Sequence, residues 1–349
     1  MGIRAKTLLA IIAVAVLLAG ALYAVSITVI LRGYGDLERE DMAGKIEEAN
    51  AALSYVLDTL QASARDWASW DDTYAFMRDV DQAYIDSNLT PETLANLGIA
   101  YILFFDRGGR LIYGAGLDGE RQALTEVPSE LGDASFFVGP LLADGDGDSG
   151  VEGLVSLPQG AMLAVSQPIL TSTGQGPFRG TLVMMRPLDE AEVEGLFRLT
   201  LLSIDLRPVG DPGLPDDFRQ AVSRLSGGDA VYVHPLDEKR VAAYSFLEDV
   251  AGEPIMVMKV DAERFIYEQG VATIFSFSWI LLGVILASGA LVAVILERLV
   301  TKRLERLDAE IDEITESGNP AMRVHAHGRD ELSRLAQAIN GMLAELERS

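Results

Sequence analysis

The chain has 349 residues, of which 52 are acidic and 28 basic, and its formal net charge is −24. So acidic a chain is poorly suited to bind nucleic acid or to lie on an anionic lipid surface, and a solvated acidic surface accounts for the charge. Because the sequence contains no cysteine, disulfide bonds, thiolate catalysis and cysteine-ligated zinc, haem or iron–sulfur centres are excluded.

The first element is an apolar run at residues 7–31, which is long enough to cross a hydrocarbon layer of about 30 Å as a helix. It is longer than the core of a signal peptide, and no small-residue cleavage site follows it. We therefore expect an uncleaved transmembrane helix, with a long signal peptide as the alternative. Residues 1–6, which include Arg4 and Lys6, should be cytoplasmic.

Residues 32–270 are expected to form an extracytoplasmic domain, and residues 33–270 hold the whole negative balance of the chain. Apolar residues recur every three to five positions between 33 and 64, which predicts a helix that continues the first span outward. Short apolar segments separated by turns follow and predict an antiparallel sheet with short helices. The strand candidates are 99–105, 110–113, 135–139, 153–157, 161–165, 180–185, 200–206, 230–234, 241–246 and 254–260, and the helix candidates include 188–196 and 216–225.

The segment 66–76, DWASWDDTYAF, places aromatic and acidic side chains side by side. On a helix, Trp70 and Tyr74 share one face and Asp71 lies next to it. Aromatic faces with carboxylates could bind an amine or another cationic ligand. The alternative is a structural role, in which this helix end is locked onto the sheet and its carboxylates cap backbone N–H groups. The ligand-binding candidates are Trp70, Asp71, Tyr74 and Tyr113, the last on a later strand.

Other patterns of acidic and histidine residues do not predict a catalytic or metal site. Asp144, Asp146 and Asp148 resemble the start of a calcium loop, but Ser149 and Val155 stand where an EF-hand needs glycine and glutamate. We interpret this patch as a solvated loop. No serine–histidine pair, nucleotide-binding loop or catalytic carboxylate pair stands out, so we expect no catalytic residue, no metal and no cofactor.

The second apolar run, residues 271–296, contains no charged residue and should be helical, because lipid offers the backbone no hydrogen-bond partner. Arg298 and Lys302 are among the basic residues that follow it, so this end should also be cytoplasmic. The next apolar residues are spaced four and three apart, which is a heptad pattern. We expect one rod that leaves the membrane and becomes a coiled coil without a break.

A second heptad pattern follows a connector at 316–328, which contains Gly318, Pro320 and Gly328 as helix breakers. Two parallel helices joined by an extended connector would form a four-helix bundle in a dimer. Asp330 opens the second helix, where negative charge is favourable. The expected signal-relay positions are Val300, Leu304, Leu307, Ile311, Val324, Glu331, Leu332, Leu335, Ile339 and Met342.

Residues 297–349 resemble the HAMP linker of bacterial transmembrane receptors; a generic coiled coil is the alternative. The resemblance rests on Gly318, Arg323-Val324, Asp330-Glu331-Leu332 and Ala338-Ile339-Asn340. Two positions depart from the family pattern: Arg303 stands where proline is frequent and Ser333 where glycine is frequent. Neither belongs to the heptad pattern, so we expect both to lie outside the core.

The exterior domain resembles the CHASE4 family of extracytoplasmic sensor domains. The resemblance rests on segment 66–76, on NLTPETLANLGIAYILFFDRGGRLIY at 88–113, and on EDVAGEPIMVMKVDAERFIYEQG at 248–270. It implies a Cache/PAS-like fold and a sensory role in dimeric receptors, but it supplies no ligand.

Together these features predict an α+β membrane protein. It has two transmembrane helices, an extracytoplasmic Cache/PAS-like antiparallel sheet with a long N-terminal helix, and a cytoplasmic HAMP parallel four-helix coiled coil in the dimer. We expect a bacterial inner-membrane receptor with both termini cytoplasmic.

The expected partners are the bilayer, a second copy of the chain and a small-molecule or periplasmic protein ligand. The expected output domain beyond Ser349 turns over cyclic-di-GMP or, failing that, is a histidine kinase. The alternative function is a dimeric membrane adaptor that binds a periplasmic protein without signalling.

Overall fold

The computed structural model describes residues 3–119, 122–132, 141–142, 150–174, 177–319, 321–325 and 330–348. The chain divides into two compact units, and each is described by itself. The sheet unit comprises Asp36–Ile266, and the helical unit comprises Met1–Gly35 with Tyr267–Ser349. The expected strand at 135–139 and the acidic loop at 144–148 lie outside the described residues.

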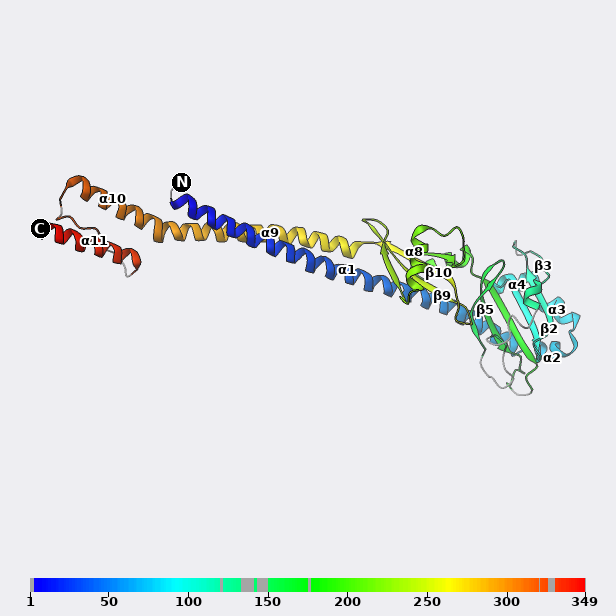
Figure 1. The fold of residues 1–349 in the computed structure, drawn as a ribbon. Coiled ribbons are helices and arrows are strands. Elements are labelled where there is room, and N and C mark those ends of the chain that lie inside the picture. Colours follow the sequence, from blue (N-terminus) through cyan, green and yellow to red (C-terminus); the bar gives the residue numbers. More distant parts are fainter. Residues whose placement is uncertain are drawn as a thin grey trace. The chain divides into compact units, whose positions relative to one another are not determined.

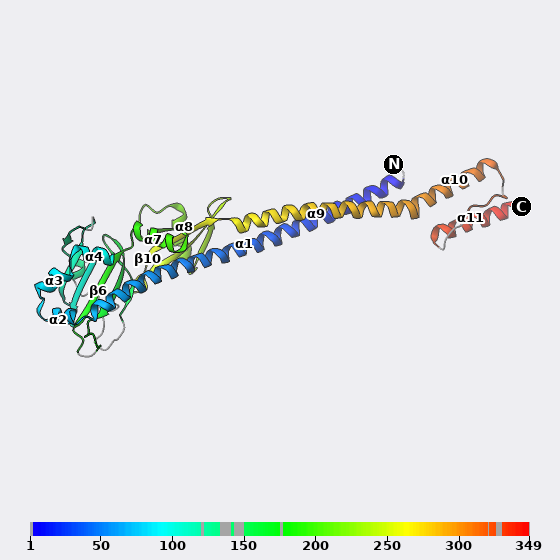
Figure 2. The ribbon, with the colours of Figure 1, turned by 180° about the vertical axis from the view of Figure 1, so that it is seen from behind.

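Helix α1 (Ile3–Ala68) is a single helix that contains both the first apolar run and the helix predicted beyond it. Within the sheet unit it buries one face, on which Met42, Ile46 and Leu60 are almost completely inaccessible. These residues belong to a hydrophobic cluster that also contains residues from both sheets of the unit. Helix α1 therefore lies along both sheets, as Figures 1 and 2 show from opposite sides.

The larger sheet has six antiparallel strands in the order β3-β2-β1-β6-β5-β4. Its central strand β1 buries four consecutive residues, 102–105, so both of its faces are covered. The bounds are β1 (Tyr101–Asp106), β2 (Leu111–Leu117), β3 (Leu124–Thr125), β4 (Glu152–Leu157), β5 (Gly160–Pro168) and β6 (Gly180–Pro187). A short helix, α5 (Ser129–Gly132), follows β3.

Three short helices connect α1 to β1: α2 (Asp71–Asp79), α3 (Gln82–Asn88) and α4 (Pro91–Leu97). Helix α4 begins with Thr90 as N-cap, whose side chain accepts a hydrogen bond from the backbone of Thr93, and with Pro91 at the first helical position. Pairing an N-cap threonine with a proline at that position is a common helix start. Phe76 on α2 and Leu94 on α4 are buried in the main core.

Helix α7 (Glu190–Thr200) leads to a second sheet of four antiparallel strands, in the order β7-β10-β9-β8. Helix α8 (Asp216–Leu225) packs on one face of this sheet through Phe218 and Leu225. The bounds are β7 (Ser203–Pro208), β8 (Tyr232–Pro235), β9 (Arg240–Glu248) and β10 (Pro254–Glu263).

The sequence indicated one sheet, whereas the structure has two. Strand β7 pairs with β10 instead of joining the first six strands. Alternation of apolar residues identifies a strand and its buried face, but it does not identify the neighbouring strand. The sheets meet where the Val250 N–H, in the β9–β10 turn, donates a 3.0 Å hydrogen bond to the Leu154 carbonyl on β4.

In the helical unit, α9 (Phe265–Leu296), η1 (Glu297–Thr301) and α10 (Lys302–Ser317) form one uninterrupted helical path. Strand β10 continues to Glu263, so α9 begins six residues before the apolar run at 271–296. The turn η1 is π-helical, a feature that the sequence did not predict. Helix α11 (Glu331–Arg348) completes this unit.

Two helices of the described chain are long and apolar enough to cross a membrane. Within them, the most apolar windows have mean hydropathies of 2.5 in α1 and 2.7 in the path that begins with α9. Large apolar side chains such as Leu17 and Phe275 are exposed along these windows, as is expected of surfaces that face lipid.

Candidate functional site

The carboxylate of Asp71, at the start of α2, is bonded to the loop between β5 and β6. Its two oxygens accept hydrogen bonds from the Ser172 backbone N–H at 3.0 Å and the Ser172 hydroxyl at 2.9 Å. These bonds, the backbone one foremost, lower the pKa of Asp71 from its ordinary value. Asp71 therefore links α2 to a loop that lies 101 residues away in sequence.

Tyr74 contacts the same loop from the next turn of α2. Its hydroxyl donates a 2.9 Å hydrogen bond to the Pro177 carbonyl, and the Arg179 guanidinium carbon lies 3.8 Å from the ring centre. Arg179 also donates to the Tyr74 carbonyl at 2.7 Å. A guanidinium over an aromatic face is an attractive cation–π contact. Tyr74 is thus held by the β5–β6 loop on both its hydroxyl and its ring.

Trp70 stacks on Trp67, with ring centres 4.7 Å apart, at the junction of α1 and α2. The segment therefore joins α1, α2 and the β5–β6 loop, and its contacts match the structural role that we considered beside ligand binding. Ser172 and Arg179 could not be recognised as partners from the sequence, because neither lies in a recognisable pattern.

Tyr113, the fourth ligand-binding candidate, lies apart from this group on β2. Its ring packs edge-on against Phe76 at 5.8 Å, in a cluster that also contains Tyr84 and Phe104. The Tyr84 hydroxyl shares a 2.7 Å hydrogen bond with Thr73, and burial raises the pKa of Tyr84 to about 12. The structure therefore brings Asp71 and Tyr74 to one loop and places Tyr113 in the aromatic core beneath α2.

A hollow between α2 and α3 lies next to this aromatic cluster. Phe76 and Tyr84 contribute to its lining, and its remaining lining is largely polar. Asp72 lines the hollow, and its carboxylate accepts no hydrogen bond among those of the described residues, in contrast to the carboxylate of the adjacent Asp71. The charged residues of the lining are Asp72, Arg78, Asp79 and Asp81.

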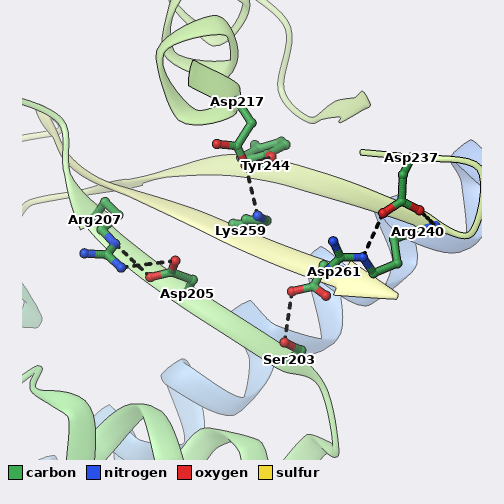
Figure 3. Close-up of polar contacts among 9 residues, drawn as sticks. All are labelled: Ser203, Asp205, Arg207, Asp217, Asp237, Arg240, Tyr244, Lys259 and Asp261. Carbon is green, nitrogen blue, oxygen red and sulfur yellow. Dashed lines mark hydrogen bonds and ion pairs between the residues drawn. The ribbon is translucent and has the colours of Figure 1, made fainter. Parts of the chain in front are cut away.

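A second polar group lies on the smaller sheet beneath α8, as Figure 3 shows. Asp217 of α8 accepts hydrogen bonds from the Tyr244 hydroxyl at 2.7 Å and from Lys259 at 2.9 Å. Burial alone would raise the pKa of Asp217, but the bonds from Lys259 and Tyr244 outweigh it and lower that pKa. Burial and the neighbouring carboxylate raise the pKa of Tyr244. This group ties α8 to the central strand β10.

The smaller sheet carries further polar contacts that Figure 3 draws: Ser203 with Asp261, Asp205 with Arg207, and Asp237 with Arg240. Each joins residues within the sheet or its turns. Among the described residues there is no group of three or more histidine, cysteine or acidic side chains that could hold a metal ion.

Helices α10 and α11 run parallel, because residues near their N-terminal ends contact each other. Arg303 of α10 forms an ion pair with Asp330 and donates a 3.2 Å hydrogen bond to the Ser333 hydroxyl. Bonds from the Ser333 backbone and hydroxyl, together with Arg303, lower the pKa of Asp330 to about 2. The expectation that Ser333 lies outside the core was wrong: it is only 2% exposed.

The connector between these helices is fixed at Val324, which is 2% exposed. The Val324 N–H donates to the Asn340 side-chain oxygen and its carbonyl accepts from the Asn340 amide, both at 2.8 Å. Three other expected relay residues, Leu307, Ile311 and Ile339, pack around Val324 in one apolar cluster.

Most of the remaining relay positions are accessible in the single chain. Val300, Leu335 and Met342 are exposed, and Leu332 lines an open groove between α10 and the start of α11, together with the edge of Leu307. Leu304 is half-buried, and Glu331 is an exposed partner of Arg334. Exposed heptad residues on two parallel helices are what a second copy would cover in a four-helix bundle.

These features define a class: a membrane protein in which an α+β domain with antiparallel sheets is joined by an apolar helix to a parallel helical linker. Residues 52–207 match the family model of the CHASE4 domain, and residues 295–348 match that of the HAMP domain. The chain thus contains a CHASE4 sensor domain and a HAMP domain. The expected resemblance at 248–270 lies outside the matched residues and stays a prediction.

The chain is similar to the methanogenesis regulatory histidine kinase FilI of Methanothrix harundinacea (strain 6Ac), with 29% identity over 316 residues. The similarity covers 89% of this chain but 34% of FilI, so the chain spans about a third of that relative's length.

Similar solved structures include a sensory box/GGDEF family protein domain of Vibrio parahaemolyticus (TM-score 0.44, 12% identity, 67% of this chain and 99% of that one). The extracellular domain of the histidine kinase vpHK1S-Z8 has a TM-score of 0.42 and 13% identity, over 68% of this chain and 95% of that one. The periplasmic domain of Vibrio cholerae LuxQ has a TM-score of 0.40 and 12% identity, over 64% and 99%.

Proposed function

We propose that this chain is the sensing and transmitting part of a transmembrane histidine kinase that works as a homodimer, with both termini in the cytoplasm. A cue received by the CHASE4 domain shifts α9, and the shift passes into the HAMP bundle. A bundle with two packings of similar free energy can pass a bias of a few kcal/mol to the domain that follows.

One observation carries this proposal: the helical path from Phe265 to Ser317 begins directly after β10 and ends in the HAMP helices. A movement of β10 would be passed along this continuous helical path to the HAMP domain. The similarity to FilI favours a kinase output over the cyclic-di-GMP enzyme that we ranked first from the sequence.

For the ligand we propose a small cation, and we place it in the hollow between α2 and α3. Three carboxylates and one guanidinium line this hollow, beside the aromatic rings of Phe76 and Tyr84. Aromatic faces and carboxylates both attract cations. Trp70, Asp71, Tyr74 and Tyr113 would then act by holding the walls of this site in place.

The test uses the full chain in membranes with Leu304→Cys as its single cysteine, since the natural sequence contains none. Disulfide formation between copies is measured with and without a panel of amines, amino acids and, as negative controls, carboxylic acids. We expect a cationic compound that raises the unfolding temperature of the chain to change the yield of cross-linked dimer as well.

Asp72→Asn should abolish both effects of such a compound. If the bound compound stabilises the chain and leaves cross-linking unchanged, the result favours the second candidate, a dimeric adaptor without signalling. A compound that acts equally on Asp72→Asn contradicts the proposed ligand site, and a purely acidic ligand contradicts the proposed ligand class.

A further inference from the structure

Two chain segments connect the sheet unit to the apolar runs. One is α1, and the other is β10, which is followed at once by α9. Strand β10 is hydrogen-bonded to β7 on one side and to β9 on the other. The turn before it touches the larger sheet through Val250 and Leu154. Strand β10 therefore extends from the contact between the sheets to the start of α9, and it is held along its length.

An ion pair joins these two segments close to where the chain leaves the sheet unit. Arg264, the residue before α9, donates to both carboxylate oxygens of Glu38 on α1, at 3.1 Å from Nε and 2.9 Å from Nη2. The two side chains are only 11% and 7% exposed. A two-pronged guanidinium–carboxylate contact fixes orientation as well as distance.

The backbone of Arg264 is fixed as well. Its N–H donates a 2.8 Å hydrogen bond to the Lys239 carbonyl in the β8–β9 turn. Removing one partner from a buried ion pair leaves an uncompensated charge, and such losses are strongly destabilising. The pair therefore resists any displacement of the end of β10 relative to α1.

In the helical unit, α1 and α9 are in contact just beyond this point in the sequence. Gly270 of α9 packs against Tyr34 of α1, so closely that a Cβ atom at position 270 would lie 2.7 Å from the Tyr34 Cγ. The Tyr34 hydroxyl also lies 3.4 Å from the Thr273 hydroxyl. The two helices are thus in register at the outer ends of their apolar runs.

We propose that Glu38 and Arg264 are positioning residues for signal transmission: their ion pair sets the register of α9 against α1 where both helices enter the membrane. This inference rests on the proposed function, because only a moving α9 gives the register a role. The family matches identify the domains and do not assign a role to either residue.

The test exploits the absence of cysteine from the chain. A Cβ atom built at Gly270 lies 2.9 Å from the Tyr34 Cβ, slightly closer than the 3.5–4.5 Å that a disulfide spans, and replacing the tyrosine ring leaves room to adjust. The pair Tyr34→Cys with Gly270→Cys should therefore oxidise readily in the full chain in membranes. The pair Leu37→Cys with Gly270→Cys reports a register that is shifted by about one helical turn, because Leu37 follows Tyr34 by three residues on α1. The Leu37 side chain is exposed, so a cysteine there is accessible.

We expect Glu38→Gln and Arg264→Gln each to slow the 34–270 cross-link on the order of tenfold and to make the 37–270 cross-link detectable. Arg264→Lys keeps the charge but loses the two-pronged geometry, so its rate should be intermediate. The matched control is Arg207→Gln on β7, which removes an exposed ion pair of the same sheet and should leave both rates unchanged.

Fluorescence of the stacked Trp67 and Trp70 shows which variants keep the folded sheet unit, and only those are compared. If the glutamine variants unfold, the rate of the 34–270 cross-link in Arg264→Lys tests the inference in their place. A folded variant of Glu38 or Arg264 that cross-links 34–270 at the natural rate overturns the inference. No ligand is added, so this outcome is separate from failure of the proposed function, which would appear as HAMP cross-linking that no bound compound changes.

Discussion

Asp71 and Asp72 are neighbours in sequence but have different surroundings. Asp71 accepts two hydrogen bonds from Ser172, whereas Asp72 lines the hollow between α2 and α3. Neighbours on a helix point about 100° apart, so adjacent carboxylates can serve different purposes. At the residue scale, the structure assigns anchoring to Asp71 and leaves Asp72 facing the hollow.

The lowered pKa of Asp71 makes a pH-dependent prediction. A carboxyl group whose pKa is lower in the folded chain stabilises the fold above its ordinary pKa of 3.8, and this contribution disappears as the pH falls through the lowered value. We expect Asp71→Asn to lower the unfolding temperature at pH 7 and to differ progressively less from the natural chain below pH 3.8.

The control for this prediction is Asp72→Asn, which should unfold like the natural chain at pH 7. Thermal unfolding followed by tryptophan fluorescence measures all three proteins over the pH range. An Asp71→Asn deficit of the same size in neutral and strongly acidic solution would show that the charge on Asp71 is not what stabilises the loop.

Gly180 lies at the start of β6, where the backbones approach closely. A Cβ atom there would lie 2.0 Å from the Phe105 carbonyl oxygen, and its φ of +153° is unfavourable for other residues. Gly160 is a matched control with φ of +134° and open space around its Cβ position. Gly160→Ala should cost about 1–3 kcal/mol from backbone strain alone.

We expect Gly180→Ala to lower the free energy of unfolding by about 1–3 kcal/mol more than Gly160→Ala, because the β1–β6 pair must also move apart. Denaturant unfolding of the two variants measures the difference. Equal losses would show that backbone strain, and not close packing of the strands, requires glycine at position 180.

At the scale of elements, the junction between α9 and α10 departs from regular helix. In η1 the Lys302 N–H bonds to the Glu297 carbonyl, five residues earlier, so the turn contains one residue more than an α-helical turn would. The helical path stays continuous, as the heptad spacing predicted, but it includes a local widening next to the HAMP domain.

Deleting Leu299 should convert η1 into regular α-helix and leave α10 facing in its present direction. Deleting Val284 within α9 should instead rotate everything beyond it by about 100°. Both side chains are exposed in the chain, so their loss changes little packing. The Leu304→Cys cross-link between copies measures the result: it should survive the first deletion and be lost with the second. Loss with both would contradict this interpretation of η1.

At the scale of the whole molecule, the domain order makes a prediction about sidedness. The CHASE4 domain should lie outside the membrane and the HAMP domain inside. Glu194→Cys on α7 should react with a membrane-impermeant maleimide in intact cells. Glu345→Cys on α11 should react only after the membrane is permeabilised. Labelling of both cysteines in intact cells would place the HAMP domain on the wrong side.

The sequence by itself determined what depends on local spacing. The apolar runs, the heptads and the alternation of strand residues each repeat over one element, and the helix at Asp216–Leu225 was predicted with the bounds that the structure has. The capping of α4 by Thr90, next to Pro91, likewise depends on neighbouring residues alone. Charge beside the apolar runs gave the expected sidedness, which the labelling experiment tests.

Only the tertiary structure decided which distant residues meet. Asp71 and Ser172 are 101 residues apart, and Glu38 and Arg264 are 226 apart. No periodic pattern connects such residues, because their contact depends on which strands pair and on where a helix crosses them. The division into two sheets and the burial of Ser333 were missed for this reason: each results from packing between elements, and the spacing within one element carries no information about its neighbour.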